Sequence, residues 1–320
     1  MHRQHHILTA VLVIGGATAA ASTAVAQDYP AKAIRIVTSP AGGGNDFVAR
    51  LVAQGITGPL GQPVVIDNRP TPVIGETVAR TAPDGYTLLV AGSSFMIGHL
   101  IQQQSFDPVR DFAPISLAGT APNVVLVHPS LPVKSVRELI TLAKARPGEL
   151  NYASSGTGST QYLSAELFKS MAGITVVNVA YGGGGPGLIA LISGEVQLIF
   201  SPSSTAAPIV KSGKARALAV TSLKPSALAP GLPTVSETGL PGYEVISVDA
   251  VWAPAKTPAA IINRLSQEIA KAINRPDIRQ RYFDAGVDVV GSTPEALAGT
   301  LQSEIAKWGK VIKSTNARPQ

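Results

Sequence analysis

The sequence predicts an α/β protein in which helices cover mixed, mostly parallel sheets. Short apolar runs alternate with amphipathic helical patterns, and turns rich in small residues separate them. The 31 Gly and 25 Pro are spread through all 320 residues, without a repeat. Hydrophobic residues make up 45% of the chain, which excludes intrinsic disorder. Strands that alternate with helices are typical of layers around largely parallel sheets.

The first half of the chain begins this alternation. Apolar runs predict strands over residues 33–38, 63–67, 87–91 and 123–128. A helix is expected over residues 45–56, with Phe47, Val48, Leu51 and Val52 facing the core because they recur at helical spacing. A further helix over residues 135–146 ends at Pro147 and Gly148.

The second half continues the pattern and then becomes helical. Strands are expected over residues 150–153, 176–180, 196–200 and 215–221, with a helix over 160–171 and further helices between the later strands. Ile261, Leu265 and Ile269 lie at i+4 spacing. A last helix is expected around residues 297–312, because Pro294 and Glu295 are typical of a helix start.

The first 26 residues have the pattern of a cleaved secretory signal. Arg3 precedes an apolar stretch over residues 7–21, and Ala24-Val25-Ala26 fits the small-x-small cleavage rule. A transmembrane anchor is the alternative, but the stretch is short and rich in Ala, Gly and Thr. We therefore expect cleavage after Ala26 and a periplasmic protein.

Residue counts exclude several kinds of chemistry. The chain has no Cys, so disulfides, thiolate nucleophiles and cysteine metal sites are impossible. Its net charge of +6 comes from dispersed basic residues, so no nucleic-acid partner is expected. A catalytic triad would have to use His99 or His128, and we interpret both as structural. Phosphate-loop, zinc-protease and nucleophile-elbow motifs are missing, so we expect no enzyme, metal or cofactor.

Four turns between an expected strand and helix consist of small polar residues. They cover residues 39–46, 92–94, 154–160 and 181–187. Helix N-termini at such turns present free N–H groups, and glycine allows a ligand close to the backbone. Four such turns could together hold a carboxylate with neutral donors. The same residues also serve turn geometry and capping alone, so Asp46 is either a ligand contact or a helix cap.

A series of short motifs resembles one family along almost the whole chain after residue 26. The chain resembles the extracytoplasmic solute receptors of tripartite tricarboxylate transporters, also called the Bug family. Among the matching pieces are Gly42-Gly43-Gly44-Asn45-Asp46, Asn68-Arg69-Pro70, Ala82-Pro83-Asp84-Gly85-Tyr86, Asp107-Pro108-Val109-Arg110-Asp111-Phe112, His128-Pro129-Ser130-Leu131-Pro132 and Gly239-Leu240-Pro241-Gly242-Tyr243. Each motif is weak alone, and their joint order and spacing carry the resemblance.

The resemblance implies a two-lobed periplasmic binding protein of the type II, flytrap kind. One lobe would contain residues 27–122 and 244–320, and the other would contain residues 123–243. Each lobe would have a mixed, mostly parallel sheet. Two crossing strands, near residues 123–128 and 243–253, would form the hinge.

The resemblance also implies a function. The protein would bind a small organic carboxylate in the cleft between the lobes and deliver it to membrane permease subunits, and we expect a monomer. By matching position, the first lobe would contribute Gly43, Gly44, Asn45 and Asp46, and the second Ser155, Thr157, Gly158, Ser159 and Tyr181. Ser93 in the second turn and Ser201 beside Phe200 complete the candidate set.

Two departures from the family pattern concern charge. Gly182 follows Tyr181 where the family usually has lysine, and Ser201 follows Phe200 where aspartate is usual. The pocket so loses a candidate cation and a candidate anion, which favours a monocarboxylate or weakly charged ligand over an amino acid or a tricarboxylate. Two other functions stay open: a sensory receptor that signals to a membrane kinase, and a secreted hydrolase on the same scaffold.

Overall fold

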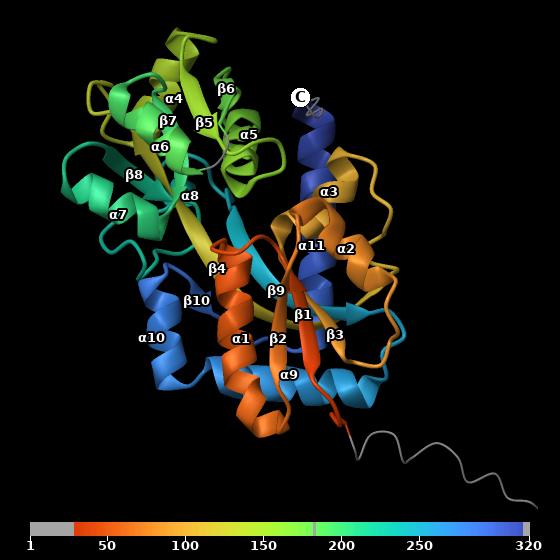
Figure 1. The fold of residues 1–320 in the computed structure, drawn as a ribbon. Coiled ribbons are helices and arrows are strands. Elements are labelled where there is room, and N and C mark those ends of the chain that lie inside the picture. The colour runs from red at the N-terminus through yellow and green to blue at the C-terminus, as the bar shows by residue number, and fades with distance from the viewer. Residues whose placement is uncertain (1–28, 182–183, 316–320) are drawn as a thin grey trace, which may run out of the picture.

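The computed structural model describes residues 29–181 and 184–315, and it contains two sheets joined by a long strand (Figure 1). The predicted signal at residues 1–26 lies outside the described residues. Within these ranges, no helix is long and apolar enough to cross a membrane. The α/β prediction is confirmed.

The first sheet has the strand order β2-β1-β3-β9-β4. Its strands are β1 (Ile34–Thr38), β2 (Val64–Asn68), β3 (Thr87–Gly92), β4 (Phe112–Val127) and β9 (Ile246–Pro254), and the short β10 (Asp288–Val289) pairs with β4. β1 is parallel to β2 and β3, whereas β9 is antiparallel to β3 and β4. The carboxyl ends of β1 and β3 therefore lie side by side.

The second sheet uses the last residues of β4. β7 (Leu198–Pro202) and β8 (Arg216–Val220) are antiparallel to β4, and β5 (Asn151–Ser154) is parallel to β7 and to β6 (Val177–Ala180). Both sheets are thus mixed, as expected. β4 and β9 run antiparallel to their neighbours, so parallel pairing is limited to β2-β1-β3 and to β7-β5-β6. The sheets therefore contain fewer parallel strand pairs than the sequence predicts.

The chain crosses between the sheets at two places. β4 pairs with β9 as far as Pro122 and with β7 from Asn123 onward. On the return path, the Val245 N–H donates to the Thr221 carbonyl just before β9 begins. The two crossings fall at the predicted hinge, residues 123–128 and 243–253.

Helices cover both faces of the sheets, and the predicted ones are present. They are α1 (Gly44–Leu60), α2 (Thr71–Ala79), α3 (Ser93–Ile101), α4 (Val136–Ala145), α5 (Thr160–Ala172), α6 (Gly184–Ser193), α7 (Ser203–Lys211), α8 (Val235–Thr238), α9 (Ala259–Ile273), α10 (Pro276–Asp284) and α11 (Pro294–Thr315). Val48, Leu51 and Val52 of α1 are buried as predicted, while Phe47 is half-buried. α11 packs against β4, α3 and α5 and so contacts elements of both sheets.

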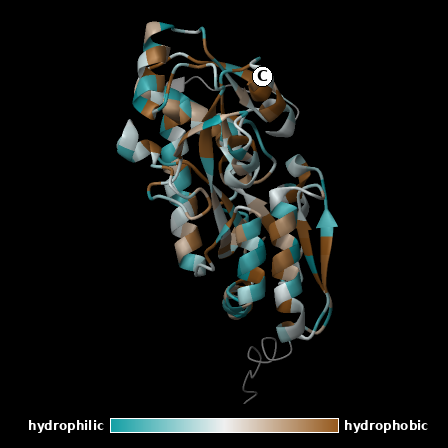
Figure 2. Cartoon of the chain, turned by 90° about the vertical axis from the view of Figure 1, so that its left-hand side faces the viewer, coloured by the Kyte–Doolittle hydropathy of each residue, from teal (hydrophilic) through white to brown (hydrophobic). Residues whose placement is uncertain are grey.

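The core follows from side-chain alternation along the strands. Ile34, Ile36 and Leu88 belong to the cluster under α1 and α9, whereas Val37 and Leu89 belong to the cluster under α2, α3 and α11. A third cluster lies under α6 and α7. In Figure 2 the strands are largely hydrophobic, and the helices alternate between hydrophobic and hydrophilic residues.

Candidate ligand-binding site

Helices that follow strands of the first sheet and a helix that follows a strand of the second sheet begin at one cleft of about 320 Å³. The carboxyl ends of β1 and β3, the first residues of α1, α2, α3 and α5, and the first residues of β9 form its walls. The lining residues are Ser39, Gly44, Asn45, Thr71, Gly92, Ser93, Ser94, Gly158, Ser159, Thr160, Ser247, Val248 and Asp249.

The N-termini of α1 and α3 reach this cleft without a side-chain cap. Their N-cap residues are Gly43 and Gly92, which have no side chain to accept a hydrogen bond from the first turn. The first N–H groups of a helix have no partner within the helix, and its dipole makes that end positive. α5 differs, because the Ser159 hydroxyl accepts from the Tyr162 N–H at 3.2 Å. α1 and α3 therefore supply uncapped donors to the cleft. The start of α2 at Thr71 also lines it without a side-chain cap.

Gly92 is required by close packing. A Cβ at this position would lie 2.4 Å from the Val248 carbonyl oxygen and 3.2 Å from Asn45 Oδ1. The next residue, Ser93, is buried, and its Oγ accepts from the Val248 N–H at 3.3 Å. Its hydroxyl proton therefore stays available to a ligand. These contacts bring α1, α3 and β9 together at the cleft.

Asp46 is surrounded by donors from its own framework. Its carboxylate accepts from the Gly42 N–H at 2.9 Å, from Asn68 Nδ2 at 2.8 Å and from Arg50 Nε at 3.0 Å. Burial alone would raise its pKa, but the hydrogen bonds from Arg50, Asn68 and Gly42 outweigh burial and lower the pKa. The contacts fit a residue that fixes the loop before α1.

Asp249 is the one ionisable side chain among the residues that line the cleft. It lies on β9 and is buried, and burial raises its pKa to about 7. No hydrogen bond joins its carboxyl group to a described residue. Below this pH the Asp249 carboxyl group is mostly neutral and can donate a hydrogen bond to a bound anion.

Two smaller cavities adjoin the cleft. One of about 210 Å³ shares Thr71, Ser94 and Gly158 with it, and another of about 240 Å³ shares Thr160. No Lys or Arg lines any of these three cavities within the described part of the chain. The donors available here are therefore amides and hydroxyls.

The predicted site residues divide among these cavities. Gly44, Asn45, Ser93, Gly158 and Ser159 line the cleft; Thr157 and Gly158 line the first smaller cavity; Ser155 and Ser201 line the second. Gly43, Asp46 and Tyr181 are not among the lining residues. The Tyr181 hydroxyl instead donates to Glu195 Oε1 at 2.8 Å.

Several lining residues were missed from the sequence. Thr71 has a signal, because Thr71-Pro72 places a proline in the first turn of α2. Ser247, Val248 and Asp249 belong to β9, which reaches the cleft by antiparallel pairing with β3 rather than through a turn. No local motif marks such a strand.

The hydrolase alternative has one geometric candidate. His128 Nδ1 lies 2.7 Å from Ser130 Oγ, in an exposed pair that lines none of the three cavities. No hydrogen bond joins His128 to a carboxylate of the described residues. In the same ranges no group of three or more His, Asp or Glu could hold a metal ion.

Comparison with known protein families shows which family the chain belongs to. The model for the tripartite tricarboxylate transporter family receptor matches residues 48–317. The chain belongs to this family. BugT of Bordetella pertussis is 35% identical over 319 residues, which cover 97% of this chain and 98% of BugT. A protein encoded between tcbD and tcbE in Pseudomonas sp. strain P51 is 33% identical over 290 residues, with 89% and 86% covered.

Solved structures of the receptor family have the same fold. An R. palustris protein with adipate is 35% identical, with a TM-score of 0.79 over 92% of this chain and 100% of that one. MatC from Rhodopseudomonas palustris, with bound malate, is 30% identical, with a TM-score of 0.75 over 89% and 100%. The periplasmic binding protein BugD is 28% identical, with a TM-score of 0.75 over 91% and 100%. The two-lobed binding-protein fold expected from the sequence is thereby confirmed.

Proposed function

We propose that this protein is an extracytoplasmic receptor that binds a small organic carboxylate and delivers it to the membrane subunits of a tripartite tricarboxylate transporter. The observation that carries the proposal is the cleft where the uncapped starts of α1 and α3 meet hydroxyl groups. An acceptor-only anion matches such donors. The adipate and malate in the related structures are carboxylates, which supports this substrate class.

The charge balance of the cleft favours a ligand with few charges. Amides and hydroxyls line the site, and no lining cation could neutralise a second or third carboxylate. Asp249 would repel a further anion whenever it is ionised. A monocarboxylate is therefore the preferred ligand.

We further propose that the carboxylate bridges two lobes, residues 27–122 with 244–320 and residues 123–243. The change of partner within β4 and the approach of the loop before α5 to α1 and α3 support this division. Such a ligand favours the closed state through its contacts with both lobes. The protein acts as a monomer, exported by a signal cleaved after Ala26, and it catalyses no reaction.

A thermal-shift screen tests the proposed function. The full chain, expressed with residues 1–26 in place and recovered from the periplasm, is screened against mono-, di- and aromatic carboxylates. A ligand at 100 times its dissociation constant adds about 2.7 kcal/mol of stability, which moves the midpoint visibly. A shift confined to one acid class is expected. No shift with any acid, together with no acid released on denaturation, would contradict the proposal.

A further inference from the structure

Asp249 stands between two glycines of the neighbouring strands. On β9 it lies opposite Gly92 of β3 and Gly119 of β4. Residues paired across antiparallel strands point to the same face of a sheet, so neither neighbouring strand places a side chain beside Asp249. A Cβ at Gly92 would lie 3.2 Å from Asn45 Oδ1, and a Cβ at Gly119 would lie 3.2 Å from Tyr282 Cε1. Asp249 therefore shares its face of the sheet with the start of α1 and with α10.

The carboxyl group of Asp249 reaches the cleft without a hydrogen-bond partner. No described residue donates to it, and neither of its oxygens is among the fully buried polar atoms that lack a partner, whereas the Tyr282 hydroxyl is. Asp249 keeps 7% of its surface exposed, and it lines the cleft. Its oxygens are therefore accessible to a ligand that is bound at the start of α1.

Ionisable groups on the two helices of this face give Asp249 no counter-charge. Burial raises the pKa of Tyr282 on α10 so far that its hydroxyl stays neutral at ordinary pH. On α1, Asp46 and Arg50 form an ion pair at 3.0 Å, and Asp46 also accepts from Asn68 at the end of β2. The charges of α1 are thus paired with each other, on the side of the helix that meets β2.

The remaining elements around Asp249 also leave it unpaired. β3 and β4 contain no ionisable residue. His99 lies in the last turn of α3, away from the helix start at the cleft, and Glu76 and Arg80 of α2 form an ion pair with each other. Asp288 belongs to β10, which β4 separates from β9. The raised pKa of Asp249 accordingly has burial as its cause.

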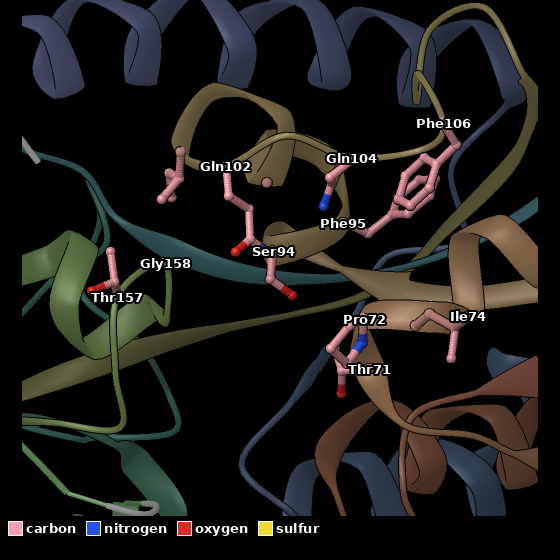
Figure 3. Close-up of a pocket in the computed structure, with 12 residues that line it drawn as sticks. Thr71, Pro72, Ile74, Ser94, Phe95, Gln102, Gln104, Phe106, Thr157 and Gly158 are labelled. Carbon is pink, nitrogen blue, oxygen red and sulfur yellow. The ribbon is translucent and has the colours of Figure 1, made fainter. Parts of the chain in front are cut away.

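The cavities beside the cleft hold no further group of this kind. In the cavity of about 210 Å³, Figure 3 shows Phe95 and Phe106 at one end, with the neutral amides of Gln102 and Gln104 beside them. Gln104 comes from the loop after α3. Among the described residues, no ionisable side chain lines this cavity or the one of about 240 Å³. Whichever cavity holds the rest of the ligand, Asp249 is the lining group whose charge depends on pH.

From this geometry we propose that the receptor takes up one proton together with its carboxylate ligand, and that Asp249 holds this proton and donates it in a hydrogen bond to the ligand. The proposal rests on the proposed function, because it assumes that the carboxylate occupies the cleft. Two ionised carboxylates would repel each other where no cation lines the site, whereas a neutral Asp249 forms a charge-assisted O–H···O⁻ bond. The proton comes from the solvent and stays on Asp249, so the receptor binds acids more tightly at acidic than at alkaline pH.

Calorimetric titration at pH 6 and pH 8 tests the proposal, with acetate, hexanoate and benzoate as probes. Without ligand the pKa of Asp249 is about 7, and the charge of a bound acid raises it further. Affinity should therefore fall about tenfold from pH 6 to pH 8. Titrations in two buffers with different ionisation enthalpies count the protons that are taken up. We expect about 0.9 proton per bound acid at pH 8 and about 0.1 at pH 6. The probes themselves are ionised at both pH values.

The variant Asp249→Asn assigns the proton to this residue. Its amide can donate to the ligand but does not titrate, so its affinity should be the same at pH 6 and pH 8, without proton uptake. Asp284→Asn, at an exposed position, is the matched control, and it should keep the tenfold fall. His99→Gln should keep it too, because His99 lines none of the three cavities.

The outcomes separate this proposal from the proposed function. Equal affinity of the native protein at pH 6 and pH 8 without proton uptake would overturn the role of Asp249 and leave the carboxylate receptor intact. Tighter binding at pH 8, a tenfold fall that persists in Asp249→Asn, or its loss in His99→Gln would overturn it as well. Failure of all three acids to bind at either pH would instead contradict the proposed function.

Discussion

Asp249 makes a quantitative prediction about stability and pH. Burial raises the pKa of this carboxyl to about 7, against about 3.9 in an unfolded chain. Between these values the folded protein holds a proton that the unfolded chain has lost. The stability that Asp249 contributes is therefore complete below about pH 4, falls as the pH rises through about 7, and stays low above it.

The magnitude follows from the difference between the two pKa values. About three units, at 1.36 kcal/mol each, give a destabilisation of up to about 4 kcal/mol at pH 8. Asp249→Asn keeps the shape of the side chain and removes the charge. It should therefore match the native protein at pH 4 and exceed its stability by up to about 4 kcal/mol at pH 8.

Urea denaturation across pH 4 to 8 measures this difference. Tyr282 on α10 senses the Asp249 charge, but burial raises its pKa far above this range, so it stays neutral throughout. Asp284→Asn is the matched control at an exposed position, and it should leave the stability unchanged at both ends of the range. If the difference in unfolding free energy between Asp249→Asn and the native protein does not grow with pH, burial does not raise the pKa of Asp249 and the reasoning is refuted.

Three further substitutions test the framework of the site. Asp46→Ala should lower stability by about 2–4 kcal/mol, because the donors around Asp46 lose their acceptor. Since the pKa of Asp46 is lowered in the folded protein, this loss of stability should shrink below about pH 4. A large loss of acid affinity without a loss of stability would identify Asp46 as a ligand contact instead. Gly92→Ala should abolish acid binding in calorimetry, because its Cβ meets the Val248 carbonyl oxygen at 2.4 Å, and native affinity would contradict this packing. Tyr181→Phe should keep acid affinity within twofold, because the hydroxyl donates to Glu195 outside the cavities, and a tenfold loss would return Tyr181 to the site.

The fold was largely predictable because its signals are local. Apolar runs marked the strands, and the turns before α1 and α5 were recognisable by their small residues. The first part of β4 was missed, because Pro114, Gly119 and Pro122 are typical of turns. β4 accommodates them with register shifts between Pro114 and Ser116 and between Leu117 and Gly119.

The candidate site was predictable only where a turn leads into a helix. Gly44, Asn45 and Ser93 follow this rule and line the cleft. Asp249 and Gln104 do not, because one arrives on an antiparallel strand and the other on a loop folded against α3. Their positions depend on contacts between distant segments, which leave no pattern in the sequence.

The central claim is that a single carboxylate is held by helix N-termini in the cleft. The most direct measurement compares hexanoate with hexanamide, a neutral molecule of nearly the same shape, by calorimetric titration at pH 6. Hexanoate should bind, and hexanamide should bind at least tenfold more weakly, because only the anion matches the uncapped starts of α1 and α3. Equal affinity for the acid and the amide would contradict the claim.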